Sequence, residues 1–321
     1  MRPRARLVVS RLTTFVVSLL VASAIIFALV NLLPGDVATA ILGDQADADS
    51  LEALRGQLGL DRPVWIRYLE WLGGLLTGDL GTTAHSGRSI AELIAPRLGL
   101  TMWLVVLGML LAMLVAFPLG MFAAVARRRW SGFVASALSQ VGMAVPAFLA
   151  GIVLVVVFAV KLHWLPANGY TPLSRGVGDW ARHLVLPVVS IALVQASVLS
   201  RYVRSAFIEV LEEDWFRTAR SVGWTTRAAM VRHGLRNAAL SVVTVLGLQL
   251  STLFVGAIVV ESVFALPGLG RQLLEAVEQR ELVLVQYIVM ILVALVLVIN
   301  ALVDLAYLLI DPRLRSEEVE R

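Results

Sequence analysis

The chain has no cysteine and only one lysine. Without thiols it cannot carry a disulfide framework, a thiolate metal site or a cysteine nucleophile. The single lysine, Lys161, follows Val160 rather than a glycine, so it cannot complete the G-x-x-x-x-G-K-[ST] loop that cradles nucleotide phosphates. If ATP powers this protein, we therefore expect another chain to bind the ATP and its Mg²⁺, and we expect this chain to bind no cofactor itself.

Charged residues are also scarce. They make up 16% of the 321 residues, while hydrophobic residues make up 59%; an ordinary soluble domain is about a quarter charged. A membrane span needs about 20 mostly apolar residues. On that criterion the sequence predicts an all-α integral membrane protein with about six transmembrane helices. The predicted spans are Leu12–Leu33, Leu98–Ala126, Phe133–Leu162, Leu184–Leu199 with its flanks, Ala238–Val263 and Leu282–Ile310.

Three of these segments need comment. Arginines precede the first, as in a signal peptide, but its apolar run exceeds the ~7–15 residues of a signal sequence, so we expect an uncleaved span. Pro146 is expected to kink the third rather than end it, because neighbouring helices can satisfy the carbonyl group that it frees. Pro187, Gln195 and Ser197 interrupt the fourth, which can be extended toward Phe207.

The arginines predict the orientation, since cytoplasmic loops carry an excess of positive charge. With the N-terminus in the cytoplasm, more arginines fall in the inside segments than outside, and Arg127–Arg129 cluster in a very short inside loop. Both termini are therefore predicted to be cytoplasmic. The predicted organisation is an N-terminal helix and extracytoplasmic loop (1–97), a five-helix core (98–312) and a cytoplasmic tail (313–321).

Two segments outside the membrane are long enough to fold. In the outer one, 34–97, the spacing predicts helices over Ser50–Gly59 and Val64–Leu76, the second with an aromatic and apolar face (Trp65, Tyr68, Leu69, Leu72). The inner one, 201–237, contains the stretch DWFRTARSVGWTTRAAMVRHGLRN from Asp214 to Asn237.

This inner stretch has the pattern of two short helices around a glycine. Phe216, Ala219 and Val222 recur at helical spacing and predict one apolar face, with Arg217 and Arg220 on its polar flank. Gly223 permits a left-handed turn. Thr225 or Thr226 is expected to cap a second helix, whose Ala229, Met230, His233 and Leu235 face inward or toward a partner. Such an element suits docking into a partner's groove or lying on anionic lipid, and the residues alone do not decide between these.

The stretch resembles the EAA loop of permease subunits in binding-protein-dependent ABC importers of the dipeptide/oligopeptide type. That family's loop reads D-[YF]-[VI]-R-T-A-R-A-K-G and then R-H-x-L-R-N-A. The matching residues, which the resemblance assigns to coupling with an ATPase, are Asp214, Phe216, Arg217, Thr218, Ala219, Arg220, Gly223, His233, Arg236 and Asn237. The chain departs from the pattern at Ser221 and Val222, in place of Ala-Lys, and at Ser241, where proline is common.

Other family landmarks follow in order along nearly the whole chain. They include Leu33-Pro34-Gly35-Asp36, Gly78-Asp79-Leu80-Gly81-Thr82, Trp164-Leu165-Pro166-Ala167, Glu261-Ser262-Val263-Phe264, Pro267-Gly268-Leu269-Gly270 and Asp311-Pro312-Arg313. They resemble the subunit type with the long first outer loop.

The resemblance implies a type I ABC importer permease fold in the plasma (inner) membrane of a prokaryote. It implies a second homologous permease, two ABC ATPases and an extracytoplasmic substrate-binding protein as partners, with no nucleic acid. The chain itself would be a non-catalytic subunit. Its family carries di- or oligopeptides, with nickel, glutathione or another small solute as alternatives. A secondary transporter is the competing class, and it would be expected to show inverted repeats and buried ionisable residues.

Polar residues within the spans are candidates for the translocation path. Gln195, Gln249 and Glu261 are the candidates, and Gln249 and Glu261 lie about 3.3 turns apart on one side of the fifth span. Contacts between helices explain such residues equally well. Asp304, in the last span, is more simply an acid at the inner interface than a functional group. The four histidines lack H-E-x-x-H spacing, so no metal site is predicted, and no catalytic constellation stands out.

Overall fold

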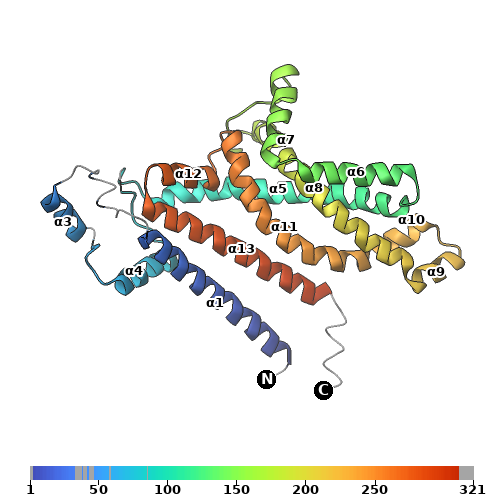
Figure 1. Cartoon of the computed structure of the whole chain (residues 1–321), viewed down its shortest axis with the longest axis horizontal. Coiled ribbons are helices and arrows are strands. Elements are labelled where there is room, and N and C mark those ends of the chain that lie inside the picture. Colours follow the sequence, from blue (N-terminus) through green and yellow to red (C-terminus); the bar gives the residue numbers. More distant parts are fainter. Residues whose placement is uncertain are drawn as a thin grey trace. The chain divides into compact units, whose positions relative to one another are not determined.

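The computed structural model describes residues 3–32, 38, 42, 47–57, 59–84 and 86–310. Within these residues the protein is helical apart from turns and one isolated antiparallel bridge between Thr82 and Ser89 (Figure 1). The landmarks Leu33–Asp36 and Asp311–Arg313, residue His85 and the predicted tail lie outside the described residues, as do the side chains of Arg236 and Asp304.

The described part contains five helices that are long and apolar enough to cross a membrane, and a sixth span if one bent pair counts as a single crossing. This confirms the predicted fold class. The five helices are α1 (Pro3–Leu32), α5 (Ile90–Val125), α8 (Val177–Glu212), α11 (Leu235–Val263) and α13 (Leu282–Ile310).

The chain divides into two compact units. The first, Met1–Thr101 with Pro267–Val298, contains α1, α3 (Ala48–Gln57), α4 (Val64–Thr77), α12 (Leu269–Glu278) and most of α13. Its core includes an aromatic chain in which Phe27 contacts Tyr68 and Trp71, with ring centroids 5.4 and 5.8 Å apart, and Trp71 contacts Tyr287 at 5.9 Å.

Both helices predicted in the outer segment are present in this unit. The predicted apolar face of α4 is present, but the protein buries only part of it. Tyr68 and Leu72 pack against the core, as does Trp71, while Trp65 and Leu69 are exposed. Helix α12 was not predicted, although Leu269, Leu273 and Ala276 have the spacing of a buried helical face.

The second unit, Met102–Leu266 with Ile299–Arg321, contains the rest of α5, α6 (Trp130–Ala144), α7 (Ala147–Leu154), α8 and α11. Shorter helical segments connect them. These are the π-helix η1 (Val155–Lys161), the 3-10 turn η2 (Leu173–Arg175), α9 (Asp214–Ser221), α10 (Thr226–Ala229) and the π-helix η3 (Met230–Gly234).

The expectation that Pro146 only kinks the third span was wrong. Residues 130–144 and 147–161 form two segments bent by 99°. The residue before a proline is pushed out of the helical region, and Val145 is accordingly extended (φ −88°, ψ 119°), as is Pro146 (φ −62°, ψ 144°). One helix therefore ends at Ala144, and the next begins at Ala147 with Pro146 at its N-cap.

Helix α8 is longer than the interrupted fourth segment suggested. It runs unbroken through Pro187 for 36 residues, about 54 Å, whereas the hydrocarbon layer is about 30 Å thick. Small residues bring α6 close to it. The Ser139 and Ser200 hydroxyls are 2.7 Å apart, and a Cβ added at Gly142 would overlap Ser197. Helices α6, α7 and α11 pack along α8, which makes α8 the central helix of this unit.

Candidate functional site

The loop between α8 and α11 folds as predicted into short helices around a glycine. Helix α8 ends at Glu212, and α9 begins at Asp214, so a single extended residue, Glu213, separates them. At the other end, α10, η3 and α11 follow one another without a break. Both ends of the loop are thus attached directly to long membrane helices.

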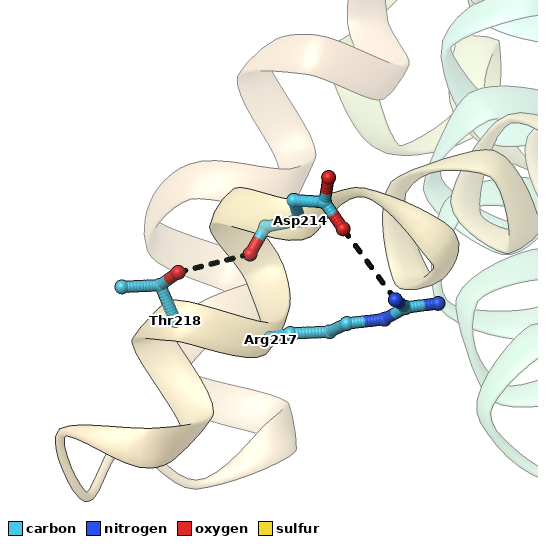
Figure 2. A network of polar contacts seen from close by, with 3 residues as sticks. All are labelled: Asp214, Arg217 and Thr218. Atoms are coloured by element: carbon cyan, nitrogen blue, oxygen red, sulfur yellow. Dashed lines mark hydrogen bonds and ion pairs between the residues drawn. The ribbon is translucent and has the colours of Figure 1, made fainter.

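Three predicted site residues form a small polar network on α9 (Figure 2). The Arg217 guanidinium lies 3.4 Å from a carboxylate oxygen of Asp214, and the Thr218 hydroxyl donates a 3.0 Å hydrogen bond to the Asp214 carbonyl oxygen. The Arg217 and Asp214 side chains are 72% and 95% exposed. Exposed ion pairs contribute about 0–1 kcal/mol to stability, so this edge of α9 remains free to meet another molecule.

The opposite face of α9 is buried against its own unit. Phe216 is buried in a cluster with Phe207, Val210 and Met230, and Ala219 packs beside it. The prediction that Val222 belongs to this face was wrong, because Val222 is 70% exposed. Helix α9 ends at Ser221, and the backbone of Val222 (φ −85°, ψ 12°) leaves the helical phase that the spacing argument assumed.

Gly223 makes the predicted left-handed turn, with φ +98°. Its N–H donates to the Arg220 carbonyl oxygen at 3.2 Å, and the Trp224 N–H donates to that of Ala219 at 3.2 Å. This pair of bonds is the Schellman arrangement at a helix C-terminus. A 2.6 Å hydrogen bond from the Arg220 guanidinium to the Trp224 carbonyl oxygen reinforces the turn.

Thr225, rather than Thr226, caps the second helix. Its hydroxyl accepts a hydrogen bond from the Ala228 N–H at 3.2 Å. The predicted inward side chains of Ala229 and Met230 are fully buried. The Asn237 side-chain amide donates to the carbonyl oxygen of His233 at 3.2 Å.

His233 contacts two tryptophans, which the sequence argument missed. Its ring is 6.4 Å from that of Trp215 on α9 and 5.6 Å from that of Trp224 in the turn, edge-on in both cases. The Arg232 guanidinium lies over the Trp224 ring at 5.7 Å. The sequence signal was two tryptophans and a histidine in one short loop, but it indicates contact only once the chain is known to fold back at Gly223. We call Trp215, Trp224 and His233 the aromatic clasp.

Two of the three path candidates meet inside the second unit. The Gln195 side-chain amide donates to the Gln249 carbonyl oxygen (3.3 Å) and to the Thr252 hydroxyl (3.4 Å), which joins α8 to α11. Gln195 is buried, and its side-chain oxygen has no hydrogen-bond partner among the described residues. Glu261 is also fully buried, but it lies about 18 Å farther along α11 from Gln249. The three candidates therefore do not form one cluster.

Among the residues that the structure describes, no group of three or more His, Asp or Glu side chains is placed to hold a metal ion. The site thus consists of a folded polar and aromatic loop and a buried amide contact between two spans.

Comparison with known proteins identifies relatives of this chain. Residues 116–316 match the family described as "Binding-protein-dependent transport system inner membrane component", and residues 4–103 match the N-terminal region of such components. The chain is 40% identical over 308 residues to the glutathione transport system permease protein GsiC of Salmonella choleraesuis (strain SC-B67), covering 96% of this chain and 98% of that protein. It is 38% identical to GsiC of Escherichia coli (strain K12) over the same shares.

A solved structure shares the fold. It is titled "Inward facing conformations of the MetNI methionine ABC transporter", and it superposes with a TM-score of 0.57 at 16% identity, covering 68% of this chain and 97% of that one.

Proposed function

Since the chain belongs to the family of binding-protein-dependent transport system inner membrane components, and is thus a permease subunit of an ABC importer, we propose that it forms one half of a path for small peptides. A second homologous permease forms the other half, and an extracytoplasmic binding protein delivers the substrate. Two separate ATPase subunits bind ATP and Mg²⁺ and supply the energy.

The observation that carries this proposal is the way the loop is attached. Its outer surface combines the exposed apolar side chains of Val222 and Val231 (70% and 56% exposed) with the exposed charge of Arg217. Its ends continue into α8 and α11, the two helices that Gln195 joins inside the unit. A partner that moves the loop therefore displaces α8 and α11 directly.

This attachment suits energy coupling. A ligand shifts a conformational equilibrium only by its difference in affinity between the two states. We propose that the ATPases bind the loop more tightly in one arrangement of α8 and α11, so that ATP binding and hydrolysis switch the access of the path. The loop is then cytoplasmic, and so are both termini and the turn at Arg127–Arg129.

The substrate class rests on the relatives. The GsiC proteins are named for glutathione, a tripeptide. This supports a substrate of about that size with a peptide backbone. Gln195 remains a candidate for the path, since its buried side-chain oxygen has no hydrogen-bond partner in the described residues.

Affinity purification of the tagged chain from native membranes, followed by mass spectrometry, tests the assembly. We expect a second permease, one or two ATPases and a binding protein. Reconstitution of that complex then allows uptake of labelled glutathione, dipeptides and nickel to be compared. Recovery of the chain alone, in mild detergent with an ATP analogue present, would overturn the proposed assembly with these partners.

A matched pair of variants tests the loop itself. Val222 and Val177 are both exposed valines, at 70% and 67%, but Val177 begins α8 while Val222 lies beyond its other end. We expect Val222→Glu to reduce recovery of the ATPases and Val177→Glu to leave it unchanged. Equal recovery from both variants would remove the docking role from this surface.

A further inference from the structure

Helix α4 (Val64–Thr77) has an apolar arc that is wider than the protein covers. With 100° between successive residues, Trp71, Leu75, Tyr68 and Leu72 occupy about 100° of its circumference, and Trp65, Leu76 and Leu69 continue the arc for roughly another 60°. Glu70 and Arg67 lie on the remaining side. A helix with this distribution needs an apolar environment along both parts of the arc.

The first part of the arc is covered by the protein's own membrane helices. Trp71 is 7% exposed, and it packs with Tyr68 against Phe27 of α1 and with Tyr287 of α13. Both α1 and α13 are long and apolar enough to span a membrane. Helix α4 is thus fixed to the side of two spans.

The second part of the arc is open. Trp65, Leu69 and Leu76 are 65%, 57% and 82% exposed. Along the face of α1 that carries Ser23 and Phe27, the preceding turns are also apolar and open, with Leu20 at 45% and Val16 at 44% exposed. The exposed stripe of α4 therefore lies beside the surface of a membrane span.

Hydrogen bonds between α4 and α1 set the depth of α4. The Tyr68 hydroxyl is 2.8 Å from that of Ser23, and the Arg67 guanidinium donates to the Asn31 side-chain oxygen at 2.8 Å. Ser23 and Asn31 are about 12 Å apart along α1, whose span ends at Leu32. The apolar side of α4 thus meets α1 inside the span, while its charged side meets α1 at the end of the span.

We propose that α4 is an interfacial helix that lies in the leaflet surrounding the C-terminal end of α1. Trp65, Leu69 and Leu76 enter the acyl region, and Arg67 and Glu70 face the headgroups and water. Interfacial helices bury their apolar face about 5–10 Å into this boundary, and tryptophan is enriched there. The partner of the stripe is lipid rather than a soluble protein, because α4 contacts α1 at Ser23, inside the span, while the charged residue Arg67 contacts α1 at Asn31, at the end of that span.

Site-directed spin labelling tests this, since the chain has no native cysteine. Leu69→Cys is compared with the matched control Glu70→Cys, its neighbour in the same helix. Leu76→Cys provides a second position on the stripe. Each variant of the full chain, with whatever subunits copurify, is placed in nanodiscs of phosphatidylethanolamine and phosphatidylglycerol. Accessibility to oxygen, which concentrates in acyl chains, and to a water-soluble nickel chelate is then measured.

We expect the oxygen-to-nickel accessibility ratio to be several-fold higher at residues 69 and 76 than at residue 70. Equal ratios at residues 69 and 70 would overturn the proposal. So would a high nickel accessibility at residue 69 that falls when the binding protein is added, because the stripe would then be a protein-docking surface. Leu76→Cys decides the outcome if Leu69→Cys does not assemble. None of these readouts depends on ATP or transport, so the result is independent of the proposed function.

Discussion

The Trp224 and His233 rings lie edge to face, with centroids 5.6 Å apart, although Trp224 belongs to the turn after α9 and His233 to the π-helix that leads into α11. Trp215, on α9, also contacts the His233 ring, with centroids 6.4 Å apart. The aromatic clasp therefore holds together the two arms that diverge at Gly223. A movement of α9 is therefore transmitted to η3 by ring contacts as well as by the backbone.

Replacement of His233 is expected to loosen the loop. An aromatic pair contributes about 0.5–1.5 kcal/mol beyond its buried area, so we expect His233→Ala to weaken the contact between the arms by about 1–2 kcal/mol. In the assembled transporter, substrate uptake per ATP hydrolysed should fall, while the ATPases still copurify.

His233→Phe is the control, because it keeps a ring beside the two tryptophans and should restore most of the coupling. A purely structural role for His233 would lower the thermal unfolding midpoint of His233→Ala without changing the ratio of uptake to ATP hydrolysis.

Gly223 is constrained by its backbone rather than by space. A Cβ at this position would meet no atom within 4 Å, but φ is +98°, where a β-branched residue is strained by roughly 1–2 kcal/mol. We expect Gly223→Val to disrupt the turn and reduce uptake strongly while membrane insertion stays normal. Gly223→Asn should be milder, since Asn tolerates positive φ. Unchanged uptake with normal copurification of the other subunits would refute the role of the turn.

Gln195 allows a test of the path. Its two hydrogen bonds to α11 are long, at 3.3 and 3.4 Å, and its buried oxygen has no partner in the described residues. Gln195→Leu therefore removes little binding energy between helices and leaves no polar group unpaired, so we expect the unfolding free energy to change by less than about 1 kcal/mol. If Gln195 lines the path, peptide uptake should still fall. Normal uptake by a stable variant would assign Gln195 to helix packing.

The orientation can be checked with single cysteines. Ser131, beside the Arg127–Arg129 cluster, and Ser174, in η2, are both exposed and are predicted to lie on opposite sides of the membrane. In intact cells, a membrane-impermeant maleimide should label Ser174→Cys at once and Ser131→Cys only after permeabilisation. The reverse pattern would invert the predicted topology.

The spans were predictable because a bilayer imposes one strong condition on the sequence. Backbone groups in lipid must be satisfied internally, so a long apolar run such as Leu282–Ile310 coincides with a helix, here α13, over its whole length. The turn at Gly223 was predictable for a similar reason, since few residues other than glycine adopt positive φ readily. Both predictions depend on local chemistry alone.

Some of the errors arose where distant parts of the chain decide the structure. Hydropathy could not predict that α8 extends well beyond the bilayer thickness, because its C-terminal end is stabilised by packing of Phe207 and Val210 against the loop rather than by lipid. The spacing of Val222 was misleading because the Schellman turn ends α9 first. The aromatic clasp required knowledge of how the loop folds back.

The π-helix η3 determines how α11 is rotated about its own axis. A π turn accommodates one residue more than an α turn, and it stands immediately before α11. Removing one residue from Met230–Gly234 would turn all of α11 by about 100° about its axis, which would carry Thr252 away from Gln195 without altering any residue in the membrane. The direction in which this span faces is therefore set by the number of residues in the loop that precedes it.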